Sequence, residues 1–129
     1  MVAVDTHILV RLLTQDDELQ YQKSLNIFQE QDIFIPDTVI LETEWVLRFA
    51  YKFKPPDICS TLRKLFGLPN VYIVNTNILD RVLQWHENGL DFADAFHLAQ
   101  SQNHTCFYTF DEKFIKKANE LTSCEVKKP

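Results

Sequence analysis

Short apolar segments alternate with longer segments of helical periodicity along the 129-residue chain. The short segments are rich in β-branched and aromatic residues, which is typical of strands buried on both faces of a sheet. They lie at residues 2–4, 33–35, 71–74 and 106–110, with a weaker candidate edge strand at 124–126. Segments with helical spacing fill the intervals, at 7–13, 16–28, 37–53, 55–67, 75–88, 91–102 and 112–121. The alternation predicts an α/β fold whose parallel sheet is covered by helices on both faces.

No repeat, low-complexity tract or linker interrupts this pattern, so residues 1–129 are expected to form a single domain. In an open parallel sheet, ligands bind beyond the carboxyl ends of the strands. Two predicted strands end in an aspartate, Asp5 and Asp111. Each of them also precedes a predicted helix, so each is a candidate N-cap as well as a candidate ligand. Asp37 is a further candidate N-cap, for the helix expected at 37–53.

A second acidic pair lies in the segment DFADAFHLA, where Asp91 and Asp94 begin a predicted helix. Their spacing of three places them on one face near the helix N-terminus. Asp91 is a candidate cap, and Asp94 complements the helix dipole. However, the residues after Asp94 are almost all apolar, and a carboxylate against such a surface needs a partner. Asp94 is therefore a candidate ligand as well as a first-turn acid.

Two glutamates on the segment VILETEWVLRF are expected to have different surroundings and different roles. Glu44 has Arg48 four residues later and is interpreted as half of a surface ion pair. Glu42 has no cation at helical spacing, and it is predicted to lie on an apolar stripe with Thr38, Val39, Trp45 and Val46. A buried carboxylate without a counter-charge is costly, and a coordinated cation removes that cost. The pattern favours Glu42 as a metal ligand.

Composition narrows the class of site. The net charge of −5 argues against a non-specific nucleic-acid binder, but it suits an enzyme that acts on phosphates through a bound cation. The three cysteines and four histidines lack zinc-type spacing. Oxygen ligands without such a set indicate Mg²⁺ or Mn²⁺ and phosphoryl chemistry by activated water. No apolar segment is long enough to span a membrane, and the N-terminus lacks a signal-peptide pattern, so the cytoplasm is expected.

Four segments, in order, resemble the PIN-domain family, and more narrowly the toxin ribonucleases of VapBC toxin–antitoxin modules. They are VAVDTHILVRLL, PDTVILETEWVLR, GLDFADAFHLA and FYTFDEKF. The resemblance implies a three-layer α/β/α PIN-like domain with a central parallel sheet of four to five strands. It also implies Mg²⁺- or Mn²⁺-dependent RNA cleavage that leaves 5′-phosphate and 3′-hydroxyl ends.

Carried over by position, the resemblance assigns the four catalytic, metal-binding acids to Asp5, Glu42, Asp94 and Asp111. It implies supporting roles beside these acids for Thr6, His7, Asp91 and Thr109. Thr6 and Thr109 are expected to hydrogen-bond the acids, and Asp91 is either a cap or an auxiliary acid. His7 departs from the family, which usually has asparagine there, and an imidazole is bulkier and titrates near neutrality.

Nearby basic residues are candidate RNA contacts, although a solvated helix face explains them equally well: Arg11, Lys113, Lys116 and Lys117. The resemblance also implies a homodimer and a small antitoxin partner. Two alternatives stay open, a stand-alone PIN nuclease of RNA processing or decay, and a non-catalytic α/β binding domain. A receiver domain is disfavoured because the expected adjacent acid pair and mid-sheet acceptor are not evident. A haloacid-dehalogenase-type phosphatase is disfavoured because His7 stands where its second aspartate would be.

Overall fold

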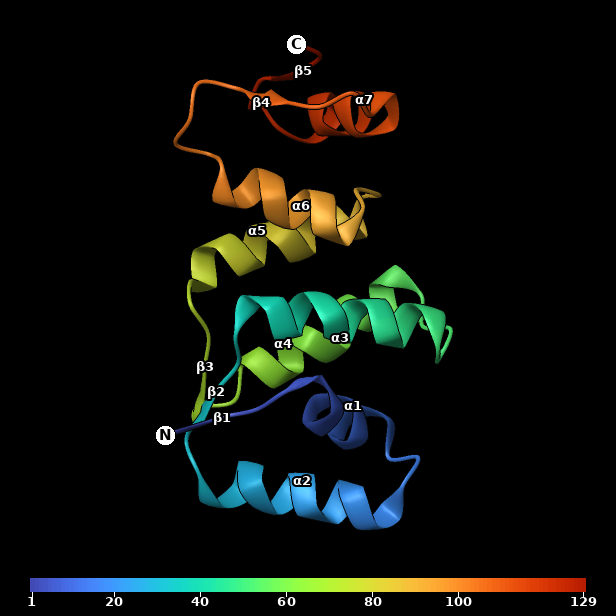
Figure 1. Cartoon of the computed structure of the whole chain (residues 1–129), viewed down its shortest axis with the longest axis vertical. Coiled ribbons are helices and arrows are strands. Elements are labelled where there is room, and N and C mark those ends of the chain that lie inside the picture. Colours follow the sequence, from blue (N-terminus) through green and yellow to red (C-terminus); the bar gives the residue numbers. More distant parts are fainter. The chain divides into compact units, whose positions relative to one another are not determined.

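The computed structural model describes residues 1–129 and contains two compact units, Met1–Val74 (unit 1) and Asn75–Pro129 (unit 2). Strands and helices follow one another along the chain in the predicted order (Figure 1). All strand pairs are parallel, as predicted. The prediction of a single domain is not tested by this division and stays a prediction.

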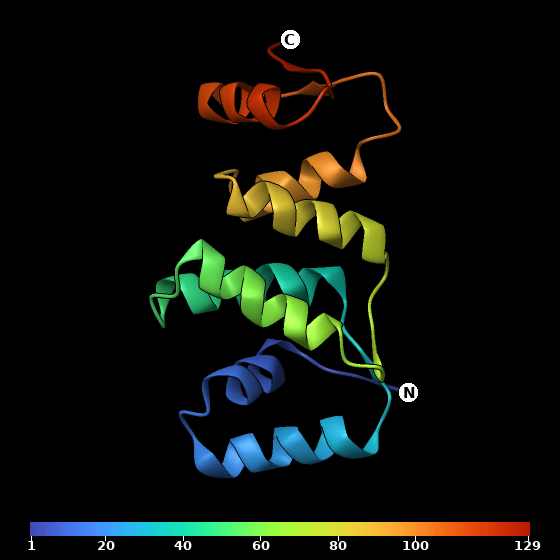
Figure 2. The ribbon, with the colours of Figure 1, turned by 180° about the vertical axis from the view of Figure 1, so that it is seen from behind.

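Unit 1 contains three strands and four helices. In chain order they are β1 (Val2–Ala3), α1 (Thr6–Thr14), α2 (Glu18–Glu30), β2 (Ile33–Phe34), α3 (Asp37–Phe49), α4 (Pro55–Phe66) and β3 (Val71–Tyr72). The sheet order is β1-β2-β3, with Ile33 opposite both Val2 and Val71. Helix α1 packs against α2 and α3, and α3 packs against α4. Seen from behind, α3 and α4 lie side by side (Figure 2).

The core of unit 1 comes from the apolar positions that the periodicity selects. Fully buried side chains include Leu9 of α1, Ile33 of β2, Ile40 and Leu47 of α3, and Leu62 of α4. Burying each such aliphatic side chain contributes roughly 1.5–3 kcal/mol relative to exposure. This shared core holds the N-terminal ends of α1 and α3 in fixed relation to each other within the unit.

Unit 2 contains α5 (Thr76–Glu87), α6 (Phe92–Gln100), β4 (Phe107–Tyr108), α7 (Glu112–Leu121) and β5 (Val126–Lys127). Helix α5 packs against α6, and β4 pairs with β5, which contacts α7. Phe92 is completely buried and meets the rings of His86 and Phe96 edge-on, with centroids 5.2 and 5.9 Å away. The weak edge strand expected at 124–126 is present as β5, shifted by one to two residues.

Several predicted boundaries were wrong. Asp37 is the first residue of α3 and not its cap, because Pro36 occupies the N-cap position. The helix ends at Phe49 instead of continuing to about residue 53. Lys52 takes a left-handed backbone conformation (φ 60°), and Lys54 is extended before Pro55, which disfavours helical geometry in the preceding residue. The strands at 71–74 and 106–110 are each only two residues long.

No helix is both long and apolar enough to cross a membrane.

Candidate functional site

Asp5 lies between β1 and α1 and caps the helix. Its Oδ1 accepts a hydrogen bond from the backbone N–H of Ile8 at 3.3 Å. The side chain is exposed, so it remains accessible to solvent and ions. A carboxylate has two oxygens, and capping by Oδ1 leaves Oδ2 for a ligand. The two interpretations of Asp5, cap and metal ligand, are therefore compatible.

The first and second acidic segments meet in unit 1. Thr6, the first residue of α1, is buried, and its hydroxyl donates a hydrogen bond to Oε1 of Glu42 on α3. The two residues are 36 positions apart in sequence. The bond is made possible by the packing of α1 against α3. Thr6, which follows Asp5 in the chain, therefore orients the Glu42 carboxylate.

The burial predicted for the two α3 glutamates was wrong. Glu44 is buried (2% exposed) together with Ile40, Thr43 and Leu47, whereas Glu42 is exposed. The buried positions follow i, i+3, i+4, i+7 spacing, which defines the inward face of a helix. That spacing was present in the sequence, but the apolar Val39, Trp45 and Val46 suggested another face. Glu42 is therefore not a buried, unpartnered acid, and its candidacy depends on its contact with Thr6.

Glu44 is held by a bidentate ion pair with Arg48 one turn later. Arg48 Nε lies 2.8 Å from Oε2, and Nη2 lies 3.2 Å from Oε1. The glutamate side chain is 3% exposed and the arginine side chain 33%. The pair was predicted correctly, but it is buried on the glutamate side instead of lying on the surface.

The third and fourth acidic segments interact in unit 2. Asp91 caps α6 through a 3.2 Å hydrogen bond from the N–H of Asp94, which stands in the first turn. Burial, followed by the negative charges of Asp91 and Asp111, raises the pKa of the Asp94 carboxyl, and His97 opposes the shift. Asp91 and Asp111 thus disfavour ionisation of the Asp94 carboxyl, as nearby negative charges do.

Asp111 is positioned in the same manner as Asp5. Its Oδ1 caps α7 by accepting from the N–H of Phe114 at 3.1 Å. The hydroxyl of Thr109 accepts from the backbone N–H of Asp111 at 3.1 Å. Thr109 was expected to bond an acid, and it instead shapes the turn that carries one. Asp111 is exposed, so its second oxygen is accessible.

The predicted ligands are divided between the units, with Asp5 and Glu42 in unit 1 and Asp94 and Asp111 in unit 2. No group of three or more His, Cys, Asp or Glu side chains is gathered closely enough to hold a metal ion. The donor chemistry nevertheless fits a hard cation, since every candidate supplies carboxylate oxygens and the negative charges of Asp91 and Asp111 raise the pKa of Asp94. The four-acid site stays a prediction.

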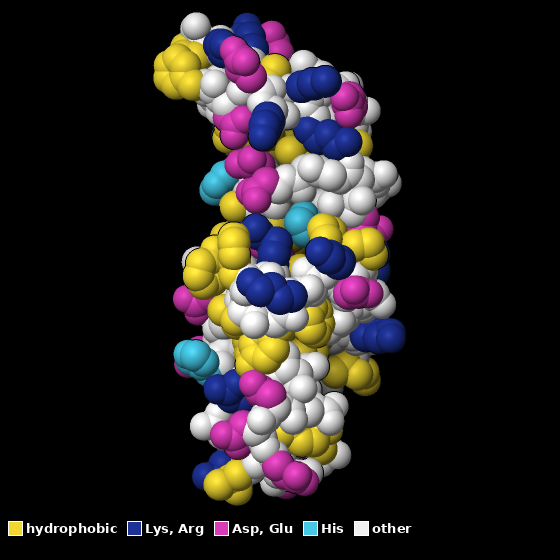
Figure 3. Space-filling model, turned by 90° about the vertical axis from the view of Figure 1, so that its right-hand side faces the viewer, with side chains coloured by type: hydrophobic (Ala, Val, Ile, Leu, Met, Phe, Trp, Pro, Cys, Tyr) yellow, Lys and Arg dark blue, Asp and Glu magenta, His cyan; other side chains and the backbone are white.

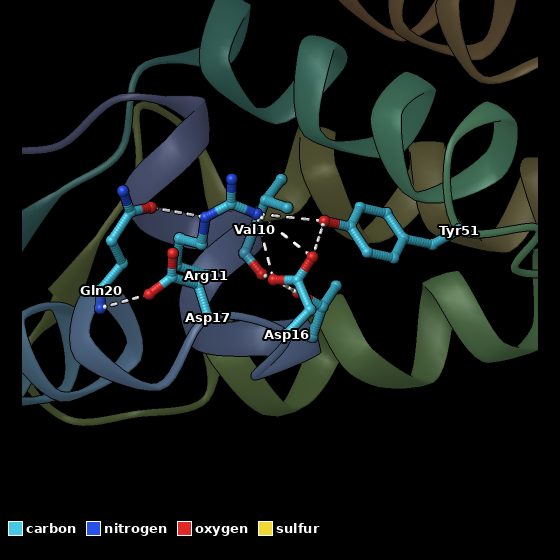
Figure 4. Close-up of polar contacts among 7 residues, drawn as sticks. Val10, Arg11, Asp16, Asp17, Gln20 and Tyr51 are labelled. Atoms are coloured by element: carbon cyan, nitrogen blue, oxygen red, sulfur yellow. Dashed lines mark hydrogen bonds and ion pairs between the residues drawn. The ribbon is translucent and has the colours of Figure 1, made fainter.

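Arg11, a candidate RNA contact, takes part in a polar cluster that sequence reasoning missed (Figure 4). Its guanidinium donates to Gln20 at 2.6 Å, to Asp16 at 3.0 Å and to the hydroxyl of Tyr51 at 3.1 Å, while Tyr51 in turn donates to Asp16. These contacts connect α1, the start of α2 and Tyr51, the second residue after α3. No local signal could have revealed Tyr51, which lies 40 positions from Arg11. Arg11 therefore has a structural role, whatever its part in RNA binding.

The cluster predicts a pH-dependent stability. The hydrogen bond from Tyr51 lowers the pKa of Asp16 below its usual value of 3.8. Because the folded pKa is depressed, the stability from ionised Asp16 is present above its unfolded pKa and is lost as pH falls through the folded one. We expect Tyr51→Phe to lower the Tm at neutral pH, with a difference from wild type that closes as the pH is lowered through this range. Tyr21→Phe, a tyrosine outside the cluster, is the control, and a pH-independent difference would contradict the assignment.

The remaining predicted residues lie at the surface. His7, Lys113 and Lys116 are exposed, whereas Lys117 pairs with Glu120 at 3.3 Å. On the face drawn in Figure 3, lysine and arginine side chains are interspersed with acidic ones. This mixture agrees with the net charge of −5 and leaves the predicted RNA contacts untested.

Comparison with known proteins identifies the family. The sequence matches the PIN domain family over residues 2–120, a stretch that includes all four candidate acids. Among solved structures, the chain is similar to the Mycobacterium tuberculosis toxin VapC20, described as cleaving the sarcin-ricin loop, with 16% identity and a TM-score of 0.45 over 97% of this chain and 99% of that one. No curated protein matches significantly. The family match confirms the predicted PIN-like α/β/α fold class. The chain belongs to the PIN domain family, whose members are nucleases.

Proposed function

We propose that this protein is a Mg²⁺- or Mn²⁺-dependent endoribonuclease, the toxin of a type II toxin–antitoxin system. In this proposal Asp5, Glu42, Asp94 and Asp111 bind the metal, and cleavage leaves 5′-phosphate and 3′-hydroxyl ends. The family match supports nuclease activity. The order of the four acidic segments supports the narrower resemblance to VapBC toxins. A small antitoxin protein and a second copy of the chain are the proposed partners, with the cytoplasm as the proposed location.

One observation carries the proposal: the hydrogen bond from Thr6 to Glu42. It connects the segment VDTH at the start of α1 with the segment ETEW on α3, two helices that pack together. Formation of neither helix depends on this hydrogen bond. A buried threonine that follows an exposed aspartate in the chain and orients an exposed glutamate suits an arrangement of ligands better than a surface without function.

The chain's own residues would prepare the reaction by positioning charge. Asp5 and Asp111 are held by the N-terminal N–H groups of α1 and α7, so their carboxylates have fixed orientations at positive helix ends. Thr6 limits the rotation of Glu42. Asp91 caps α6 and thereby places Asp94 in the first turn. When bound, the divalent ion would supply an activated water and stabilise negative charge on the phosphate.

Metal removal tests the proposal. We expect EDTA to abolish cleavage of a 5′-labelled structured RNA, and added Mg²⁺ or Mn²⁺ to restore it. Because an ion that binds only the folded state stabilises it, Mn²⁺ at about 100 times its Kd should add about 2.7 kcal/mol to the free energy of unfolding. This stabilisation should disappear in an Asp5→Asn, Asp94→Asn double variant, since two proposed ligands lose their charge.

Two results would contradict the proposal: cleavage that persists in EDTA, and a protein that neither cleaves RNA nor responds to Mn²⁺. The second result would favour a non-catalytic binding domain. Asp57→Asn serves as the control for loss of negative charge alone, because Asp57 is an exposed acid in the first turn of α4. The toxin assignment has its own test, which is whether a co-expressed antitoxin-like protein encoded beside the gene suppresses cleavage.

A further inference from the structure

Two large aromatic side chains on α3 are exposed to solvent. Trp45 is 56% and Phe49 48% exposed, and both lie in unit 1. They stand one helical turn apart with ring centroids separated by 5.0 Å and planes inclined by 47°. We call Trp45 and Phe49 the α3 aromatic pair. Adjacent exposed aromatic rings of this size mark a contact surface more often than isolated apolar residues do.

The α3 aromatic pair is held in place from the interior. Buried Glu44 fixes the Arg48 guanidinium by two hydrogen bonds. The guanidinium carbon of Arg48 lies 4.5 Å from the centroid of the Phe49 ring, a cation–π contact. Phe49 in turn contacts Trp45. The buried ion pair thus explains why these exposed rings have defined orientations, and a preorganised surface loses less entropy when a ligand binds.

The pair begins one turn from a proposed metal ligand. Trp45 follows Glu42 by three positions, which places the two side chains on the same face with Cβ atoms about 5–6 Å apart. Thr6, the residue after Asp5, orients Glu42. The exposed side of α3 therefore presents first an acid, then an indole ring and then a phenyl ring.

From this arrangement we infer that Trp45, supported by Phe49, stacks on an unpaired base of the RNA substrate next to the cleaved phosphate. The inference depends on the proposed function, which supplies RNA as the substrate. Nucleobases stack on aromatic side chains when they are unpaired, whereas the bases of a duplex are inaccessible to such stacking. Because the chain carries a net charge of −5, it has no overall electrostatic attraction to a polyanion, so contacts to the bases would have to contribute to its affinity. The protein would thus select single-stranded segments or loops.

The test measures binding without cleavage. The first experiment uses an Asp5→Asn variant in which Trp85, the buried second tryptophan, is also replaced by phenylalanine. All tryptophan fluorescence then comes from Trp45. We expect quenching by a single-stranded oligoribonucleotide, and none by a duplex or by an abasic backbone of equal length. The second experiment measures the affinity for labelled RNA by fluorescence anisotropy, with Trp85 unchanged. Trp45→Ala should weaken this affinity about tenfold or more. Trp45→Phe should keep most of the affinity, and Leu19→Ala, an exposed apolar residue of α2, should keep all of it.

Three results would overturn the inference. One is equal binding of the abasic backbone, and another is RNA affinity unchanged by Trp45→Ala in a variant with wild-type Tm. The third is a change from dimer to monomer in Trp45→Ala without loss of RNA binding, which would assign the surface to a protein contact. Failure of the proposed function is distinct: it appears as absence of metal-dependent cleavage by the wild-type protein, measured separately. If the wild type cleaves RNA but Trp45 does not respond, only the stacking inference fails.

Discussion

Replacing Asp5 by asparagine is expected to reduce the rate of RNA cleavage about 100-fold or more while leaving the fold intact. Asparagine caps helices about as well as aspartate, so the hydrogen bond to the N–H of Ile8 can persist. The substitution removes the negative charge that would bind the cation. Since metal ions contribute several kcal/mol of transition-state stabilisation, the rate should fall by about 100-fold or more. The measurement is single-turnover cleavage of a labelled RNA at saturating Mg²⁺, alongside thermal unfolding.

The structure offers a closely matched control. Asp17 caps α2 as Asp5 caps α1, accepting from the N–H of Gln20 at 3.1 Å, and it belongs to none of the four acidic segments. Asp17→Asn should therefore cleave at the wild-type rate. If both variants cleave RNA at the wild-type rate, Asp5 is only a helix cap. If both lose activity, the effect comes from helix capping and not from metal binding.

The two glutamates of α3 are expected to separate stability from activity. Glu44→Ala should reduce the free energy of unfolding by about 2–3 kcal/mol, because it leaves the partly buried Arg48 without its bidentate partner. This loss is no larger than the smallest losses typical of broken buried ion pairs, about 3 kcal/mol, because the Arg48 side chain is one-third exposed. Glu42→Ala should reduce stability less, by about 1 kcal/mol, because Glu42 is exposed and the substitution removes only the hydrogen bond from Thr6, and it should reduce cleavage about 100-fold.

Chemical denaturation and single-turnover cleavage of both variants check this prediction. Glu30→Ala, an exposed glutamate at the end of α2, should stay within about 0.5 kcal/mol of wild type and cleave normally. The opposite pattern, in which Glu42→Ala unfolds the protein and Glu44→Ala only inactivates it, would show that the buried face of α3 is the one first predicted from the sequence.

Local sequence signals were sufficient for the order of elements and for most helix starts. Asp17 and Asn75 cap their helices by accepting from N–H groups three residues later, and Pro55 begins α4. These interactions involve neighbours in the chain, so their chemistry is visible in the sequence. Strand lengths were less predictable, since a strand ends where its partner's hydrogen bonds end. The pairing of β2 with both β1 and β3 depends on residues more than 30 positions apart.

The acidic segments, their order and their family were determined by the sequence alone, because residue types and spacing carry that information directly. Only the tertiary structure decided which face of α3 is buried. Glu42 and Glu44 are two positions apart on a helix that has apolar residues on several sides, and the choice between faces depends on packing against other elements. The same packing brings Thr6 to Glu42 and Arg11 to Tyr51, contacts between residues far apart in the chain. Local pattern does not encode such contacts, since they form when separate helices share one core.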